Sequence, residues 1–348
     1  MVNCWIRRVR RDLLSPWQQV LIIALLALPV MATAAPTSFA DWLAGVKQQA
    51  MSQGVREVTI DQAFRGLEPD PRVLGFDKKQ PEFVQTFEAY LRARVTSKKA
   101  DQARQYYQEN RQALKLIAAK YQVDPQYLIA FWGLESHFGG YQGKYQVIRS
   151  LATLAYDPRR SQFFTRELLA ALKVLDEGHV PLADFLGGWA GAMGQNQFMP
   201  SSFLNFAQDF DGDGKKNIWD NRLDVWASIA YYLQQNRWRE GESWGMQVDI
   251  AGAVDFDKLM PETVSAGCRA QRSHTRELSL VEWSALGVTP LVVKPDDGQK
   301  FAMIKPEAGA TVGYLVGPNF GSILRYNCAN KYAVSIGLFA DMIASDPE

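Results

Sequence analysis

The stretch VDPQYLIAFWGLESHFGG, residues 123–140, decides the fold of this chain. Asp124 is suited to cap a helix that begins at Pro125, because proline is tolerated in the first turn and an aspartate accepts hydrogen bonds from the unpaired amides there. Gly139 and Gly140 provide a stop, since glycine adopts the left-handed conformation that ends helices at little cost. The sequence therefore predicts a helix between these two signals.

One acidic residue lies on an apolar, aromatic face of this helix. The face consists of Leu128, Phe131, Trp132, Glu135 and Phe138, which follow one another at helical spacing. Burial and the negative end of the helix dipole both disfavour a carboxylate, so we expect the pKa of Glu135 to be raised. A carboxylic acid still protonated near neutral pH is what glycosidic bond cleavage requires. The alternative is a buried glutamate paired with an arginine, or one that reaches solvent, and the helix taken alone favours this alternative.

Toward the N-terminus, the chain begins with a predicted export signal. Four arginines at positions 7–11 precede the apolar run 20–30, and small residues follow at 32–35. This order is typical of a secretory signal peptide over residues 1–35, and the apolar run is too short for a comfortable membrane span. Cys4 precedes the run, so it does not occupy a lipoprotein cleavage site. We therefore expect a soluble, non-lipidated protein in the periplasm.

Charge and cysteine content narrow the functional classes. The formal net charge is +1, and removal of four arginines and one aspartate with the signal peptide changes it to −2. A nearly neutral chain gives no support for nucleic-acid binding. Beyond residue 35 the cysteines are Cys268 and Cys328, and in an oxidising compartment we expect a disulfide between them. Two unpaired, buried thiols are the alternative.

Apolar spacing divides the rest of the chain into helical and strand-like parts. Residues 36–122 have helical spacing, with one long run from Ala100 to Tyr121. From residue 244 to 315 the runs MQVDIA, TRELSLVEW, TPLVVK and FAMIK are strand-like and broken by Gly, Pro and Asp, which predicts a small β-rich subdomain. Residues 316–348 return to helix.

The glycine-rich stretch GGWAGAMGQNQFMPSSF, residues 187–203, follows the central helix. Its small residues allow close backbone approach, and Gln195, Asn196, Gln197 and Ser201 offer neutral hydrogen-bonding groups that suit a polyhydroxylated ligand. A tight helix junction explains the glycines equally well. The stretch is not a phosphate loop, because no Gly-Lys-Ser/Thr follows.

Residues 209–220, DFDGDGKKNIWD, have the ligand order of an EF-hand calcium loop. Asp209, Asp211 and Asp213 occupy positions 1, 3 and 5, and Lys215 can offer its carbonyl at position 7. Position 12 is an aspartate, Asp220, in place of the longer bidentate glutamate, and Asp224 is another candidate. We therefore expect a calcium site with weaker or differently closed coordination. A solvated Asp-Gly turn is the alternative.

Five motifs together resemble a known family. They are FWGLESHFG, ATLAYDPRR, GAMGQNQFMPSSF, DFDGDGKKNIWD and NFGSILRYNCANKYA, and they occur in the order found in lytic murein transglycosylases related to membrane-bound lytic transglycosylase B. The resemblance extends over nearly all of residues 38–343. The resemblance implies a mainly α (α+β) enzyme with a lysozyme-like helical core, an N-terminal helical domain and a small β subdomain. In this chain the N-terminal helical domain corresponds to residues 36–122 and the lysozyme-like core to residues 123–243. The β subdomain corresponds to residues 244–315, and residues 316–348 return to the core as helix.

The resemblance also implies roles for particular residues. Glu135 matches the catalytic acid. The family's sugar-contacting positions match Arg159, Arg160, Gln197, Tyr232, Tyr326, Asn327 and Tyr332. Tyr90 matches a further such position, but the residues around it resemble the family's motif less closely. Calcium ligands match Asp209, Asp211, Asp213 and the Lys215 carbonyl, and the closing carboxylate matches Asp224 more naturally than Asp220.

The expected reaction follows from a single acid. Most glycosidases use two carboxylates that flank the bond, whereas here Glu135 alone lies in a suitable motif and Asp157 lies beside two arginines. By resemblance, Glu135 protonates the β-1,4 bond between N-acetylmuramic acid and N-acetylglucosamine, and then serves as base while the muramic acid C6 hydroxyl closes onto C1. The partners are peptidoglycan glycan strands, and we expect a monomer. A hydrolytic muramidase and a non-catalytic, calcium-stabilised glycan-binding protein are the alternatives.

Overall fold

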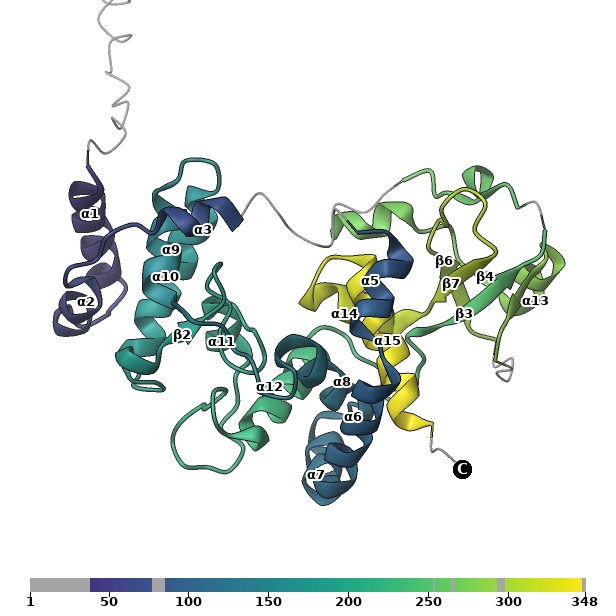
Figure 1. The fold of residues 1–348 in the computed structure, drawn as a ribbon, viewed down its shortest axis with the longest axis horizontal. Helices are drawn as coiled ribbons and strands as arrows, with labels where there is room; N and C mark the ends of the chain where they lie inside the picture. The colour runs from purple at the N-terminus through teal and green to yellow at the C-terminus, as the bar shows by residue number, and fades with distance from the viewer. Residues whose placement is uncertain (1–37, 77–84, 253, 264–266, 293–297, 346–348) are drawn as a thin grey trace, which may run out of the picture.

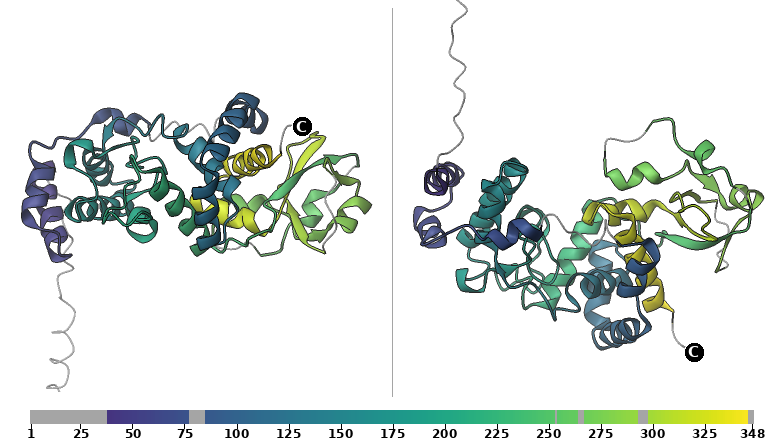
Figure 2. Two further views of the ribbon diagram at one scale, coloured as in Figure 1. Left: turned by 90° about the horizontal axis from the view of Figure 1, so that it is seen from below. Right: turned by 45° about the horizontal axis from the view of Figure 1, so that its top comes forward.

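The computed structural model describes residues 38–76, 85–252, 254–263, 267–292 and 298–345. The predicted signal peptide, residues 1–35, lies outside these ranges. Within them, no helix combines the length and apolar character needed to cross a membrane. The described chain is elongated, with a pair of helices at one end and a β-sheet at the other (Figure 1 and Figure 2). The expected class, mainly helical with a small β subdomain, is confirmed.

Short helices form the N-terminal part: α1 (Phe39–Ser52), α2 (Glu57–Phe64), α3 (Pro71–Phe76), α5 (Phe87–Arg94), α6 (Ser97–Glu109) and α7 (Arg111–Tyr121). Threonine hydroxyls cap α5 and α6, where Thr86 and Thr96 accept hydrogen bonds from first-turn amides. The expected run from Ala100 to Tyr121 is broken at Asn110, whose side-chain amide donates to the carbonyl of Tyr106. An asparagine competes in this way with the helical backbone, so two helices form where one was expected.

The central helix, α8 (Pro125–Ser136), is buried on nearly every side. Asp124 is its N-cap residue and Pro125 its first residue, as predicted, but the Asp124 carboxylate accepts from Trp238 Nε1 at 3.3 Å and does not bond the first-turn amides. Burial extends beyond the predicted face, because every residue from 127 to 133 is buried. Helices α6, α7, α12 (Arg222–Gln235) and α15 (Asn330–Ala344) surround it. A helix that is apolar all round belongs at the centre of a core.

A second group of helices lies beside this centre (Figure 1). It contains α9 (Val147–Tyr156), α10 (Ser161–Asp176) and α11 (Pro200–Phe206), and a two-stranded ribbon pairs β1 (Tyr145–Gln146) with β2 (Leu186–Gly187). Helices α1 and α2 pack on α10, and α3 packs on α9. Short 3-10 helices occur at Leu182–Asp184, Phe256–Leu259 and Arg269–Ser273.

The β subdomain has a hydrophobic core of its own. Its antiparallel sheet has the order β4-β6-β7-β3-β5 and consists of β3 (Gly245–Ile250), β4 (Leu278–Ser279), β5 (Val288–Pro290), β6 (Lys300–Met303) and β7 (Val312–Val316). Trp283, Met303 and Leu315 are fully buried in this second core. One strand-like run proved partly helical, since TRELSLVEW forms the short strand β4 and then α13 (Leu280–Ala285). A reciprocal capping box between Ser279 and Glu282 starts that helix.

The chain returns to the helical core through α14 (Pro318–Tyr326) and α15. Trp244, just before β3, packs so tightly on α15 that a Cβ at Gly337 would lie 2.1 Å from its ring. The indole of Trp244 also donates to Asp341 Oδ2 at 2.9 Å. Because α15 also packs on α8, the C-terminal helix connects the sheet to the central helix.

Candidate active site

Glu135 lies in the last turn of α8 and is half-buried. The helix ends in a compact turn, in which His137 and Phe138 have positive φ values of 52° and 59° and Gly139 has one of 83°. Ser136 Oγ accepts from Gly139 N at 3.0 Å, and a Cβ at Gly139 would lie 2.5 Å from Gln195 Oε1. The predicted stop is therefore confirmed, with the left-handed turn beginning two residues before the glycine. This close-packed turn fixes the backbone that carries Glu135.

Tyr332, in the first turn of α15, donates a hydrogen bond to Glu135 Oε1 at 2.5 Å. Burial raises the pKa of the Tyr332 phenol well above its ordinary value, and the nearby charge of Glu135 raises it further. The phenol therefore stays protonated and acts as a donor at any physiological pH. The ring itself contacts Phe131, one helical turn before Glu135.

Two further tyrosines of the predicted set, Tyr326 and Tyr232, pack on each other. The rings of Tyr326 and Tyr232 lie 4.7 Å apart, and Tyr326 lies 4.7 Å from Phe131. The Tyr326 hydroxyl donates to the Asn196 carbonyl at 2.7 Å, and the Tyr232 hydroxyl donates to the Arg325 carbonyl at 2.7 Å. Burial raises the pKa of Tyr326, with a smaller contribution from Glu135.

Tyr90 comes from α5 and is almost completely buried. The guanidinium of Arg94 lies over the Tyr90 ring, with its Cζ 3.6 Å from the ring centroid. Tyr90 also makes a small contribution to the raised pKa of Tyr332. The four tyrosines singled out from the sequence come from α5, α12, α14 and α15, and Tyr332 among them bonds Glu135.

Gln197 lies in the glycine-rich stretch, in a backbone conformation with a φ of 50°. Its side-chain amide donates to the carbonyls of Gly194 at 2.9 Å and Gln142 at 3.2 Å. The neighbouring Gln195 accepts from Trp132 Nε1 and donates to the Trp219 carbonyl, both at 2.6 Å. These bonds hold the stretch against the end of α8, and they show that Gln195 has a bracing role there.

Arg159 and Arg160 lie at the start of α10. Arg159 forms a bidentate pair with Asp157, with Nε to Oδ1 at 2.9 Å and Nη2 to Oδ2 at 2.8 Å. Arg160 lies over the ring of Phe164, with its Cζ 4.7 Å from the centroid. Asn327 is the partly buried C-cap residue of α14, directly after Tyr326.

Glu167 is a buried acid that the motifs did not reveal. Its two carboxylate oxygens accept from the backbone amide and the hydroxyl of Ser201, at 2.9 and 2.7 Å. Ser201, which the sequence offered as a ligand group, therefore anchors the start of α11 to α10. A carboxylate bonded twice in this manner has a structural task. The sequence signal for it was weak, because Glu167 falls on the apolar face of an ordinary amphipathic helix.

The aspartate loop brings three carboxylates together. Oxygens of Asp209, Asp211 and Asp213 lie within 4.8 Å of one another. Asp209 also accepts from the amides of Gly212, Asp213 and Gly214, which shapes the loop around it. This convergence fits a hard, oxygen-preferring cation such as Ca²⁺.

The two candidates for closing this loop differ in burial. Asp224 is fully buried and accepts from Phe210 N and Asn217 N, both at 2.7 Å, so it braces both sides of the loop. Burial raises its pKa to about 6, against the lowering effect of these two amide bonds. Asp220 is exposed, and its own amide donates to Asn217 Oδ1. The converging carboxylates are those of Asp209, Asp211 and Asp213, so the identity of the closing ligand stays a prediction.

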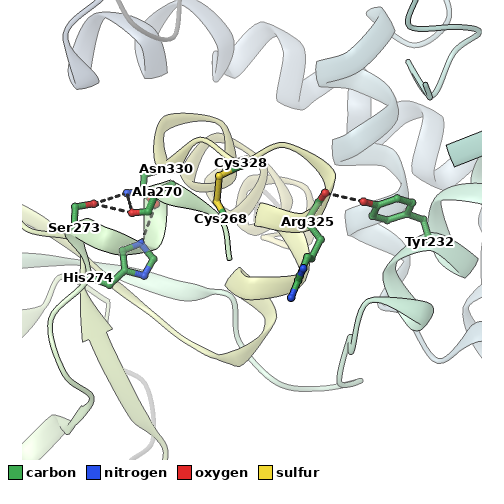
Figure 3. Close-up of a disulfide and its surroundings, with 8 residues drawn as sticks. All are labelled: Tyr232, Cys268, Ala270, Ser273, His274, Arg325, Cys328 and Asn330. Atoms are coloured by element: carbon green, nitrogen blue, oxygen red, sulfur yellow. Dashed lines mark hydrogen bonds between the residues drawn. A yellow bond between two sulfur atoms is a disulfide. The ribbon is translucent and has the colours of Figure 1, made fainter. Parts of the chain in front are cut away.

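The predicted disulfide joins Cys268 to Cys328, which are 60 positions apart in the sequence (Figure 3). It connects the β subdomain to the link between α14 and α15. Beside it, His274 bonds Asn330 Oδ1 at 2.9 Å, and Asn330 Nδ2 donates to Ser273 Oγ and to the Ala270 carbonyl (Figure 3). Asn330 begins α15, which carries Tyr332, so these contacts fix the subdomain next to the candidate site.

Fold and site together define a class: a mainly helical protein in which one carboxylate lies among tyrosine hydroxyls and amides that suit sugars. The family model described as "Transglycosylase SLT domain" matches residues 38–341. The chain therefore belongs to this family of lytic transglycosylases, as the motifs predicted.

Individual relatives agree with this assignment. Membrane-bound lytic murein transglycosylase B of Escherichia coli (strain K12) is 31% identical over 243 residues, which are 69% of this chain and 62% of that protein. SltB3 from Pseudomonas aeruginosa, solved in complex with NAG-NAM-pentapeptide, has a TM-score of 0.80 at 36% identity, with 89% of this chain and 81% of that chain covered. Slt35 of Escherichia coli, solved in complex with calcium, shares the fold with a TM-score of 0.70 at 24% identity, with 87% and 92% covered.

Proposed function

We propose that this protein is a peptidoglycan lytic transglycosylase that cleaves the β-1,4 bond between N-acetylmuramic acid and N-acetylglucosamine. The observation that carries the proposal is the placement of Glu135, a half-buried acid fixed by a close-packed turn and bonded by the Tyr332 hydroxyl. Membership of the family and the SltB3 complex with a peptidoglycan fragment support the substrate class.

In the proposed mechanism, Glu135 acts first as acid and then as base. Its proton passes to the glycosidic oxygen as the bond from C1 of muramic acid breaks. The C6 hydroxyl of the same sugar then attacks C1 and gives its proton to the Glu135 carboxylate. The products are a 1,6-anhydromuramic acid end and a free N-acetylglucosamine hydroxyl, and the glutamic acid is restored. Tyr332 holds the carboxylate in one orientation through both steps.

The use of one acid is supported by what the other candidates do. Asp157 forms a bidentate pair with Arg159, and both oxygens of Glu167 are bonded by Ser201. Two flanking carboxylates are needed when the nucleophile is water or the enzyme itself. A substrate hydroxyl as nucleophile removes the need for the second one.

We further assign sugar contacts to the side chains that surround Glu135. Tyr90, Tyr232, Tyr326 and Tyr332 supply rings and hydroxyls, while Gln197 and Asn327 supply amides. Arg159 and Arg160 are assigned to carboxylates of the lactyl or peptide groups, which guanidinium groups bind well. We place the protein in the periplasm, in agreement with the predicted signal peptide and with a disulfide, which persists in oxidising compartments.

A calcium site is part of the proposal. Asp209, Asp211, Asp213 and the Lys215 carbonyl would hold the ion, with Asp224 as the closing carboxylate. Its contribution would be structural, since it would join the loop to the start of α12. Catalysis remains with Glu135.

Product analysis with the Glu135→Gln variant tests the proposal. Purified sacculi treated with the unmodified protein should release muropeptides that end in 1,6-anhydromuramic acid, one water lighter than hydrolysed products by mass spectrometry. The Glu135→Gln protein should keep its fold and lose activity by about 10²–10⁴-fold or more, because one residue serves both proton transfers. Reducing-end muramic acid would instead identify a hydrolytic muramidase. Undiminished activity of the variant would remove the proposal.

A further inference from the structure

Three partly exposed aromatic rings form a cluster outside the proposed catalytic centre. They belong to Phe76 at the end of α3, Tyr145 in β1 and Trp189 just after β2, and we call them the aromatic ledge. The ring centroid of Phe76 lies 6.0 Å from that of Tyr145 and 6.3 Å from that of Trp189. Phe76 is 42% exposed, and the other two rings are only partly buried. Three elements distant in the sequence thus supply one aromatic surface.

The backbone beneath the aromatic ledge is packed with little freedom. Gly143 has a φ of 94°, and a Cβ there would lie 2.1 Å from the Gly187 backbone. A Cβ at Gly187 would in turn lie 2.2 Å from the Ala192 carbonyl oxygen. Trp189 lies in a tight turn closed by a hydrogen bond from Gly191 N to the Gly188 carbonyl at 3.0 Å. Trp189 is a central residue of this turn, and no side chain fits at Gly143 or Gly187 without a shift of the backbone.

The turn that carries Trp189 lies next to Gln197, one of the residues proposed to bind sugar. After Glu135, the chain runs to Gln142, whose carbonyl accepts from the Gln197 amide. A side chain placed at Gly188 would lie 3.5 Å from Gln197 Oε1, and Trp189 is the next residue. Gln197 thus lies between the segment that follows Glu135 and the turn that carries Trp189.

We propose that the aromatic ledge is a further glycan-binding subsite, which stacks on a sugar of the same strand several units away from the cleaved bond. This inference rests on the proposed function. An exposed aromatic ring next to neutral amides suits the apolar face of a pyranose, while the amides bond its hydroxyl groups. Trp189 is the central contact, with Tyr145 and Phe76 holding its position. The subsite makes affinity depend on strand length, because short oligosaccharides that fill the catalytic centre do not reach it.

Binding measurements with strands of two lengths test the inference. Peptide-free glycan oligosaccharides, one tetrasaccharide and one octasaccharide, are titrated calorimetrically into the Glu135→Gln protein, which cannot turn them over. Adding Trp189→Ala should weaken octasaccharide binding by about tenfold, the size of one aromatic stacking contact, and leave tetrasaccharide binding within about twofold. Trp189→Phe should retain part of the affinity, because a ring remains.

The chain offers a matched control. Trp42 on α1 belongs to another half-buried aromatic trio, with Phe39 and Tyr156, at ring distances of 5.3 to 5.6 Å. Trp42→Ala should change neither affinity. If Trp189→Ala lowers the melting temperature severely, Tyr145→Ala replaces it in the same titrations.

Two failures are distinguishable in this design. Unchanged octasaccharide binding in Trp189→Ala, or equal weakening for both lengths, would overturn the subsite while leaving the proposed function intact. If the Glu135→Gln protein without further changes binds neither oligosaccharide, the proposed function itself fails.

Discussion

At the scale of the residue, the carboxylate of Glu135 and the hydroxyl of Tyr332 meet although 197 positions separate them. Sequence alone identified both residues, but only as separate motif positions. The structure adds that the phenol is a protonated donor aimed at one carboxylate oxygen. This contact orients the carboxylate of a half-buried acid on an aromatic helix.

Tyr332→Phe tests the value of this orientation. The substitution keeps the ring contact with Phe131 and removes the hydroxyl that bonds Glu135. A hydrogen bond to a charged group contributes on the order of 1.5–3 kcal/mol, so kcat should fall by about 10–100-fold. Tyr121→Phe is the control, since that hydroxyl bonds Gln208 Oε1 away from Glu135 and should not affect kcat. An unchanged kcat in Tyr332→Phe would contradict the positioning role.

At the scale of the element, the aspartate loop and the start of α12 form one unit. Asn221 caps α12 through Leu223 N and also donates to Asp211 Oδ2 at 2.7 Å. The next residue, Arg222, lies over the ring of Trp132 in α8, 5.2 Å from its centroid. The loop is thereby connected to the helix that carries Glu135.

Calcium should raise the melting temperature of the protein, because a ligand bound only by the folded state stabilises it by mass action. Asp209→Ala combined with Asp213→Ala removes two of the converging carboxylates and should abolish the increase. Asp220→Ala serves as the control, since that exposed side chain should contribute little if Asp224 closes the site. Identical melting curves in calcium and in chelator would show that the loop is an ordinary turn.

At the scale of the whole molecule, the β subdomain is joined to the helical core by the disulfide, by Trp244 on α15 and by the His274–Asn330 bond. The three contacts converge on α14 and α15, which also supply Tyr326 and Tyr332. Substitutions at the interface between the β subdomain and the helical core should therefore lower the stability of the protein first. They should change its activity through α14 and α15.

Loss of the disulfide should destabilise the protein. A bridge across 60 positions stabilises by roughly 4 kcal/mol on the chain-entropy model, before any strain. Cys268→Ser combined with Cys328→Ser should lower the free energy of unfolding in denaturant by an amount of that order. A reductant should have the same effect on the unmodified protein and none on the double variant. Equal unfolding midpoints for the oxidised and reduced forms would refute this contribution.

Acidification should weaken the interface at His274. Burial lowers the pKa of this imidazole below its ordinary value of 6.5, although the bond to Asn330 opposes the shift. Below pH 6.5 the unfolded chain then binds more protons than the folded one, so stability is fully present above that pH and falls as the pH decreases. His274→Gln should reduce the slope of unfolding free energy between about pH 7 and 5. If His274→Gln and the unmodified protein had the same slope, the pH dependence of stability would come from another group. One such group is His179, whose pKa is also lowered by burial.

Much of this protein was determined by local sequence patterns. Pro125 at one end and the glycines at the other placed α8, because such signals act within one turn, whereas the cap bond expected from the Asp124 side chain does not form. The alternation of Asp209, Asp211 and Asp213 predicted the converging loop for the same reason. Cys268 and Cys328 were paired by elimination. The errors at Asn110 and at Leu280–Ala285 were also local, because the Asn110 bond to the Tyr106 carbonyl and the Ser279–Glu282 capping box each lie within about one turn.

Only the tertiary structure decided which distant groups meet. Tyr332 bonds Glu135, Glu167 binds the start of α11, and Asp224 lies beneath the aspartate loop while Asp220 faces solvent. The same applies to the aromatic ledge, whose rings come from three separate elements. Periodicity shows which side of a helix is apolar, but the packing of one helix on another sets which side chains share a site. That choice depends on the shape of the whole core, which no local stretch contains.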